Sequence, residues 1–343
     1  MSLSWNAIGL IVTGTIMTAV LFGAPQVLEL FVLLKVTVFV VMAILALSMA
    51  FIWGFGGILC FGQSAFFGLG AYAYAIAVIN MGESTVPLLL AIAVPALFAA
   101  MLGYFIFYGR LSDVYLAVIT LAVTLILYAF INSTADKFYI IGKARLNGFN
   151  GISSIPPLNW PFDATATLMP DDVFYVSMGT LILCYFGLRL LLASRFGRVI
   201  VAVRENEARA ELLGYDVRLY KLITFVIGAA IAGLAGCLFT TSINFVSPTV
   251  FSLGIAAQIL MWVIIGGVGT LVGPIIGCLA LQYLTNELGT QQVFNTSLIF
   301  GAILMVFVLL VPQGLVPTLR NLAIKMTGLG GAPPRQRETG NGR

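Results

Sequence analysis

The chain has 343 residues, of which 60% are hydrophobic and 9% are charged, and its mean hydropathy is +1.06. Soluble domains carry about 25% charged residues, so this composition excludes a soluble globular protein, a disordered chain and a disulfide scaffold. The sequence contains no histidine, which excludes histidine metal sites, Ser-His-Asp triads and histidine proton relays. The net charge of +4 does not indicate a nucleic-acid partner, because the basic residues cluster where a membrane topology would place them.

Apolar segments of spanning length cover most of the chain and predict an all-α, polytopic integral membrane protein with about ten transmembrane helices. About 20 residues cross the hydrocarbon core at the rise of an α-helix. The predicted spans are Ala7–Phe22, Val27–Trp53, Leu59–Ile79, Val86–Tyr108, Val114–Ile131, Val173–Ala193, Leu219–Thr241, Thr249–Ile265, Leu271–Leu288 and Val293–Val311. No basic segment precedes the first of them, so we expect a span that is not cleaved. The predicted transmembrane domain covers residues 1–325, and residues 326–343 are expected to form a disordered cytosolic tail.

The orientation follows from the basic residues, which concentrate in cytosolic segments of membrane proteins. Seven lie from Arg189 to Lys221, five lie in the segment from Arg320 onward, and Arg110 lies in a tight connection between spans. An even number of predicted spans separates each of these segments from the next, so one orientation places all three in the cytosol. Both termini are then cytosolic, as is the loop of residues 194–218.

The segment of residues 132–172 lies on the extracytoplasmic side in this topology. Its glycines and prolines predict turns rather than a helix. At about 40 residues it is longer than an idle connection in a compact bundle. It is either a docking surface for an extracytoplasmic partner or a cap over the bundle.

Glycines interrupt two apolar segments, Trp53–Tyr72 and Gly266–Pro274. Each glycine inside a helix costs roughly 0.5–1 kcal/mol relative to alanine, and backbone breaks persist in a membrane only where protein or a water-filled cavity supplies hydrogen-bond partners. Interrupted spans in the two halves of a transporter indicate a substrate path, although close packing of small residues would give the same pattern. The predicted path residues are Gly56, Gly57, Gln63, Ser64, Phe66, Phe67, Gly70, Gly266, Gly267 and Gly269.

Lys35 lies within the second predicted span, and an intramembrane charge is a functional candidate by default. The 18 residues from Val36 to Trp53 could nevertheless cross the membrane alone, so Lys35 is expected to extend to the outer interface. The spans carry no chain of buried carboxylates, which argues against a proton-coupled pump.

The loop of residues 194–218 predicts two helical pieces, and the second has clear end signals. Asn206 is a good N-cap, Glu207 suits the positive end of the helix dipole, and Gly214 suits a left-handed C-terminal position. Ala208 and Leu212 form an apolar ridge with Ala210 and Leu213 beside it, which fits a groove on a soluble partner or, alternatively, the inner membrane surface. The predicted docking residues are Glu205, Asn206, Ala208, Ala210, Leu213 and Gly214.

Three groups of residues resemble motifs of the branched-chain amino-acid type of ABC-importer permease, and in particular its M-type subunit. The first group is Gly57-Ile58-Leu59, Phe61-Gly62-Gln63 and Ala65–Tyr72. The second is Phe196-Gly197-Arg198, Arg204–Glu207, Ala210, Leu213-Gly214 and Tyr220-Lys221. The third is Gly266–Leu271, Gly273-Pro274 and Val311–Leu315. Trp53–Gly57 and Val114–Thr120 are also similar to the urea and short-amide branch, which leaves the solute open.

The resemblance implies a subunit of the bacterial inner membrane that is not itself an enzyme. Its expected partners are a second homologous permease in a heterodimer, two ABC ATPase subunits docked on coupling helices, and a periplasmic solute-binding protein. By similarity, Glu205–Gly214 is the coupling helix. The chain contains no GxxxxGK[ST] phosphate loop, so ATP and magnesium are expected on the partner ATPases and no cofactor or metal on this chain.

Two other classes of protein compete with this interpretation. A self-contained channel or secondary carrier for a small neutral solute would share the glycine breaks, but it would not need the capped cytosolic helix. A membrane enzyme is poorly supported, because no span carries a plausible acid–base or nucleophile–base pair.

Overall fold

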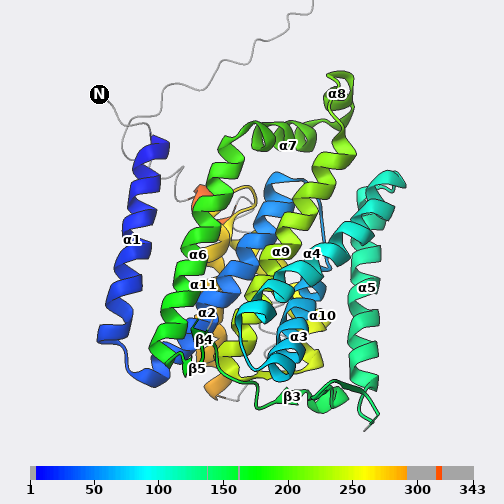
Figure 1. Cartoon of the computed structure of the whole chain (residues 1–343). Coiled ribbons are helices and arrows are strands. Elements are labelled where there is room, and N and C mark those ends of the chain that lie inside the picture. The colour runs from blue at the N-terminus through cyan, green and yellow to red at the C-terminus, as the bar shows by residue number, and fades with distance from the viewer. Residues whose placement is uncertain (1–4, 137, 161–162, 292–313, 319–343) are drawn as a thin grey trace, which may run out of the picture.

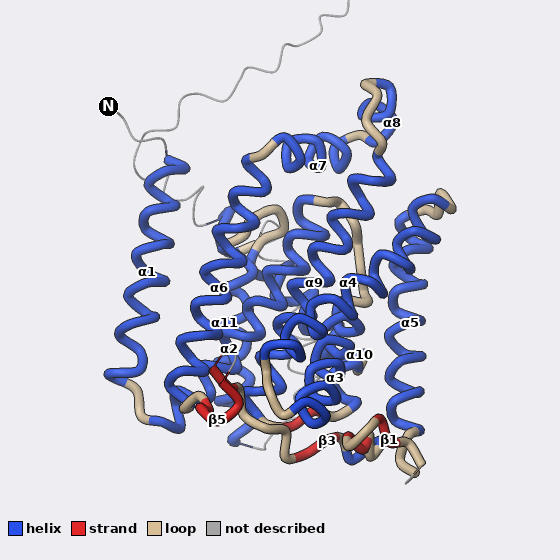
Figure 2. The backbone as a smooth tube through the Cα atoms, viewed as in Figure 1, coloured by secondary structure: helices blue, strands red, loops and turns tan. Residues whose placement is uncertain are grey.

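Long helices run side by side between two ends of the molecule (Figures 1 and 2). A computed structural model describes residues 5–136, 138–160, 163–291 and 314–318. The long helices are α1 Trp5–Val27, α2 Leu30–Met49, α3 Gln63–Met81, α4 Thr85–Tyr108, α5 Asp113–Ser133, α6 Pro170–Ala193, α9 Val217–Ile243, α10 Leu253–Gly266 and α11 Val272–Gln291.

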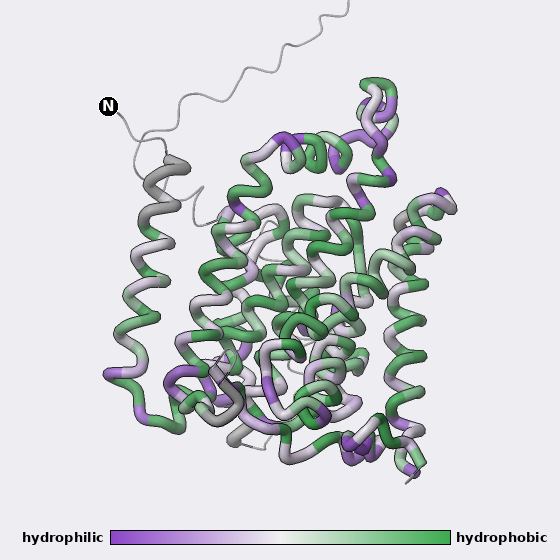
Figure 3. The backbone as a smooth tube through the Cα atoms, in the orientation of Figure 1, coloured by the Kyte–Doolittle hydropathy of each residue, from purple (hydrophilic) through white to green (hydrophobic). Residues whose placement is uncertain are grey.

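Six helical segments of the described residues are long and apolar enough to cross a membrane. They are Leu30–Phe55, Gln63–Met81, Thr85–Tyr108, Val114–Ser133, Pro170–Ala193 and Val217–Ile243, with shorter apolar helices at Val12–Val27 and Leu253–Gly266. Figure 3 shows hydrophobic colour along the bundle and hydrophilic colour concentrated at its two ends. The helical, multi-span architecture is confirmed, but the number of about ten crossings stays a prediction. The predicted span Val293–Val311 and the tail of residues 326–343 lie outside the described residues.

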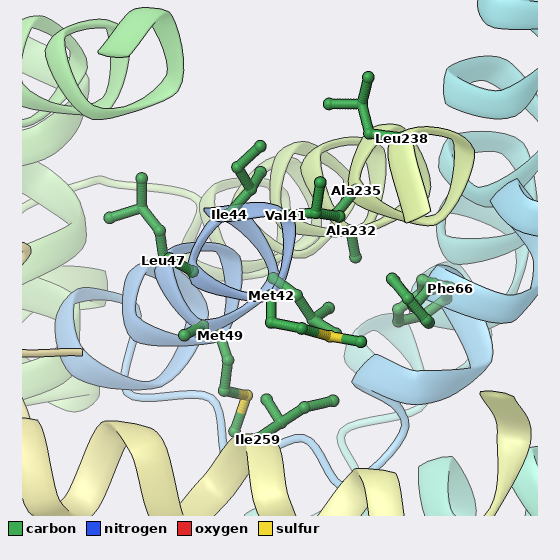
Figure 4. Close-up of a cluster of buried hydrophobic side chains, with 14 of the residues drawn as sticks. Val41, Met42, Ile44, Leu47, Met49, Phe66, Ala232, Ala235, Leu238 and Ile259 are labelled. Atoms are coloured by element: carbon green, nitrogen blue, oxygen red, sulfur yellow. The ribbon is translucent and has the colours of Figure 1, made fainter. Parts of the chain in front are cut away.

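The centre of the bundle is built from α2, α3, α4 and α9, which pack closely on one another. Figure 4 shows one layer of this core, where residues of α2 such as Met42 face Phe66 of α3, Ala232 of α9 and Ile259 of α10. The helices approach closely because small residues lie at their contacts. A β-carbon on Gly70 of α3 would lie 2.3 Å from the carbonyl oxygen of Gly233 in α9.

The first two helices differ in extent from the predicted spans. α1 continues past Phe22 to Val27, and the second span continues beyond Met49 as a π-helix at Ala50–Phe55. The chain then turns, and α3 begins at Gln63 rather than Leu59. Apolar composition locates a span but contains little information about where a glycine-rich segment leaves the helix.

The polar segment after α5 forms short antiparallel strand pairs, which an all-α prediction does not include. The pairs are β1 Ile140–Ile141 with β2 Ala144–Arg145, β3 Ile152–Ser153 with β6 Phe245–Val246, and β4 Asn159–Trp160 with β5 Asp163–Thr167. A 3-10 turn, Gly148–Asn150, lies between β2 and β3, and another, Pro248–Phe251, precedes α10. This segment lies at the end of the bundle opposite to α7 Arg195–Glu205 and α8 Glu207–Leu212 (Figure 1).

The side chain of Asn80, near the end of α3, hydrogen-bonds the β1–β2 pair to the bundle. Its Nδ2 donates to the carbonyl of Ile141 at 2.9 Å, and its Oδ1 accepts from the amide of Lys143 at 2.6 Å. The β3–β6 pair joins the same segment to the residues that follow α9. These contacts agree with a cap over the bundle, while docking of an extracytoplasmic partner stays a prediction.

Candidate functional site

The α8 helix has the end signals that its sequence predicts. Asn206 lies in an extended conformation, and its Oδ1 accepts a hydrogen bond from the amide of Arg209 at 2.8 Å. The helix ends at Leu212, Leu213 is its C-cap, and Gly214 follows with φ +86°. Six residues are too few for a stable isolated helix, so α8 depends on what it packs against.

The contacts that hold α8 come from its own chain. Ala210 is 2% exposed and packs in a small cluster with Val199 and Val203 of α7 and Val217 of α9. Lys221 of α9 forms an ion pair with Glu207. The side chains of α7 and α9 therefore fix the position of α8.

This packing corrects the predicted place of Ala210. The residue was grouped with the docking ridge, but it faces back into the loop, because positions two apart on a helix point in nearly opposite directions. Ala208 is exposed, and so are Leu212 at 89% and Leu213 at 70%. These three residues form the exposed apolar face of α8, which is called the α8 face below.

A cleft of about 400 Å³ lies beside α8, between the α4–α5 turn and the start of α9. Arg110, Arg218 and Lys221 contribute positive charge to its walls, and Glu207 and Glu211 contribute negative charge. The α8 face therefore stands next to a strongly polar surface, as at the rim of a protein–protein interface.

Replacing Asn206 by Ala should loosen α8 without unfolding the bundle. The change removes the acceptor for the Arg209 amide, and loss of such a cap costs about 1 kcal/mol. We expect faster hydrogen exchange in residues 207–212 and unchanged exchange in α9. An Asn206→Ser variant, which restores a capping oxygen, should return the exchange towards that of the original chain; equal exchange in all three proteins would contradict the capping role.

The two glycine-broken segments meet each other. A β-carbon on Gly54, in the π-helix, would lie 2.8 Å from the backbone nitrogen of Gly269 in the turn between α10 and α11. That turn has two left-handed glycines, Gly267 with φ +115° and Gly269 with φ +88°. Gly266 packs equally closely on the backbone of Gly273. Of the predicted path residues in the second break, Gly269 therefore lies beside the π-helix that precedes Gly56 and Gly57.

Gln63 and Ser64 open α3 inside the bundle, and both are buried. The Nε2 of Gln63 donates to Ser48 Oγ at 2.7 Å and to the carbonyl of Gly228 at 3.2 Å. Among the described residues, Gln63 Oε1 and Ser64 Oγ have no hydrogen-bond partner. Buried polar atoms are rarely left unpaired, so these two oxygens are available to a water molecule or a solute.

Phe66, Phe67 and Gly70 serve close packing in this structure. Phe66 contacts the ring of Phe225 edge-on, with a centroid distance of 5.2 Å, and Phe67 contacts Phe239. Gly70 lies against the backbone of α9. Close packing, the alternative weighed from the sequence, describes the contacts of these three residues, and a role in lining the path stays a prediction.

Sequence reasoning missed a polar face on α3. Ser64, Gly68 and Tyr72 are spaced four residues apart, and the hydroxyl of Tyr72 is also buried without a partner. Phe251 covers Gly68 and stacks on Tyr72 at a centroid distance of 5.7 Å. The four-residue spacing was a signal that could have identified this face.

Lys35 lies just inside the start of α2, where its ammonium is 4.4 Å from the centre of the Phe31 ring. Its side chain is half-buried. This cation–π contact one turn from the helix end agrees with a lysine that extends towards the membrane interface.

The described part of the chain therefore combines several membrane-spanning helices, glycine breaks that meet inside the bundle, and a capped helix displayed at one end. No group of three or more potential metal-binding residues occurs in the part of the chain that the structure describes. The fold and the site together define a multi-pass membrane transport protein.

The family comparison makes the class specific. Residues 31–309 match the family described as branched-chain amino acid transport system / permease component, and the chain belongs to this family. It is 29% identical over 310 residues to the high-affinity branched-chain amino acid transport system permease protein LivM of Escherichia coli, covering 83% of this chain and 69% of LivM. The LivM protein of Salmonella typhimurium is 30% identical over 308 residues, with the same coverage.

A more distant relative has a different named solute. The fructose import permease protein FruG of Bifidobacterium longum is 30% identical over 138 residues, or 38% of this chain and 40% of FruG. No solved structure matches the chain. The chain is a permease subunit of the ABC-importer type, and the named relatives are likewise transport permeases.

Proposed function

We propose that the chain forms half of the membrane channel of a bacterial inner-membrane importer and translocates branched-chain amino acids. Two ABC ATPase subunits supply the energy, a second homologous permease completes the channel, and a periplasmic binding protein delivers the solute. ATP and magnesium bind to the ATPase subunits. The observation that carries this proposal is the α8 face, because a capped helix braced on its own chain through Ala210 leaves two leucines exposed among the described residues.

The proposed topology places α7, α8 and both chain ends in the cytosol and residues 132–172 on the periplasmic side. The basic residues around α7 and α8 favour the cytosolic assignment. The position of the strand pairs at the opposite end of the bundle supports it (Figure 1). Cysteine labelling from either side of the membrane tests this topology.

The solute is assigned by analogy with the LivM relatives. The buried polar groups at the start of α3, Gln63 and Ser64, are neutral and offer unpaired oxygens. Oxygens of this kind can accept from an amino group or from an amide, so urea and short amides are the competing cargo class. Calorimetric titration of the cognate binding protein with leucine and with urea separates the two.

Purification of the tagged permease tests the importer assignment. We expect it to bring down two ATPase subunits and a second permease, and the reconstituted complex to take up solute only with ATP and the loaded binding protein. Uptake by the permease alone, with no associated ATPase, would instead establish a self-contained channel or carrier.

Replacing Gln63 by Met, or Ser64 by Ala, should slow uptake several-fold without loss of the assembled complex. Each change removes an unpaired buried oxygen while roughly keeping side-chain volume. Gln63→Met also removes the Nε2 hydrogen bonds to Ser48 and to the Gly228 carbonyl, so it should lower the thermal stability as well, whereas Ser64→Ala should not. Ser177→Ala is the matched control, since Ser177 on α6 also has an unpartnered buried hydroxyl. Equal uptake by all variants would remove Gln63 and Ser64 from the path.

A further inference from the structure

Arg204 at the end of α7, in the loop of residues 194–218, reaches into the first glycine-broken segment, Trp53–Tyr72. Its Nη1 donates to the backbone carbonyl of Gly54, and its Nη2 lies 2.7 Å from Oε1 of Glu205. The side chain of Arg204 is 34% exposed, so most of its surface is covered by protein. One guanidinium thus joins α7 to the end of the second span.

The carbonyl of Gly54 is a strong acceptor because the helix ends there. The last backbone hydrogen bonds of this helix are accepted by Phe51, Ile52 and Trp53. Carbonyls beyond that point carry the negative end of the helix dipole, and a cation placed there is stabilised. Arg204 therefore supplies the partner that the interrupted helix lacks.

Glycine makes room for Arg204 on the other side. Gly57 has φ +70°, and a β-carbon there would lie 2.7 Å from Cγ of Arg204. Gly54, which accepts the hydrogen bond, is itself in van der Waals contact with Gly269 of the second break. The chain of contacts runs from α7 through Arg204 to Gly54 and on to the α10–α11 turn.

We infer that Arg204 is the positioning residue that transmits displacement of the coupling loop to both glycine breaks. The inference rests on the proposed function, in which an ATPase subunit moves α8. Because α8 is packed on α7 through Ala210, Val199 and Val203, movement of the α8 face carries the end of α7 with it. Movement of Arg204 then displaces the Gly54 carbonyl to which it is hydrogen-bonded. The backbone around Gly54 can change conformation because its glycines have no side chains to clash.

The test compares Arg204→Gln with Arg198→Gln in the complete complex with its ATPases and binding protein. Arg198 is a matched control on the same helix, because its guanidinium donates only locally, to the carbonyl of Ala193 at 2.9 Å. The measurements are subunit stoichiometry, ATPase activity without binding protein, its stimulation by loaded binding protein, and uptake.

Arg204→Gln should assemble normally and keep its unstimulated ATPase activity, while uptake and stimulation fall about tenfold, as expected for loss of a charge-assisted hydrogen bond. Arg198→Gln should resemble the original complex. Arg204→Lys should recover part of the stimulation, since lysine keeps the charge but lacks the planar fork that reaches two oxygens. A purely structural residue would lower assembly and both ATPase activities together.

Stimulation and uptake of Arg204→Gln equal to those of Arg198→Gln would overturn the inference. If the Arg204→Gln complex does not assemble, the test uses Arg204→Lys instead. Stimulation of the Arg204→Lys ATPase equal to that of the original complex would then overturn the inference. Failure of the proposed function has a different signature, because the original permease would then purify without ATPase subunits.

Discussion

Replacing Leu212 by Asp should release the ATPase subunits from the complex and abolish ATP-dependent uptake, while the permease itself still folds. Leu212 is 89% exposed at the centre of the α8 face, so the carboxylate costs the isolated chain little. In a docked complex it would bury an unpaired charge, which typically costs several kcal/mol. Copurification of ATPase subunits, uptake and elution of the permease as a single species give the three readouts.

Two further variants test whether the loss of ATPase binding is specific to the α8 face. Ala202→Asp places the same charge on an exposed position of α7 and should leave docking intact. Ala210→Asp places it in the cluster with Val199, Val203 and Val217, where it should loosen the loop and therefore cannot separate docking from folding. Retention of both ATPase subunits by Leu212→Asp would refute docking through this face.

Replacing Gly70 by Leu should prevent the bundle from forming. A β-carbon at this position would lie 2.3 Å from the Gly233 carbonyl oxygen and 2.4 Å from its Cα, so the backbones of α3 and α9 must separate. Forced separation of two central helices costs more than the 1–3 kcal/mol typical of overpacking a side chain. The expected result is aggregation in detergent, with little monodisperse protein on size-exclusion chromatography.

Gly179→Leu provides the control for this prediction. Gly179 also lies inside a long helix, α6, but a β-carbon there meets no atom within 4 Å. It should fold and elute as the original chain does. Monodisperse Gly70→Leu protein with unchanged thermal stability would show that the α3–α9 contact is not required.

The local features of the loop of residues 194–218 were predictable from the sequence. Asn206 and Gly214 act through hydrogen bonds and backbone angles of their immediate neighbours, so their roles follow from residue type and spacing alone. The first helical piece, α7, was likewise anticipated, and its N-cap Ser194 accepts from the amide of Gly197.

Features that depend on distant parts of the chain were not predictable. The burial of Ala210 needs α7 and α9 to fold back on α8, and the contact of Arg204 with Gly54 joins residues 150 positions apart. The sequence identified both glycine breaks, but it could not separate a solute path from close packing, because each requires small residues at the same spacing. The contact between Gly70 and Gly233 shows why that position needs a glycine for packing, and a solute path there stays a prediction.

Helix α1 lies at the edge of the bundle, outside the central group of helices (Figure 1). α1 packs on α6 and touches α2 (Figure 1), and it exposes apolar residues such as Ile16 and Phe22. The family match begins at residue 31, just beyond it. Because α1 contacts the bundle mainly through α6, its displacement would leave the packing of α2, α3, α4 and α9 on one another in place.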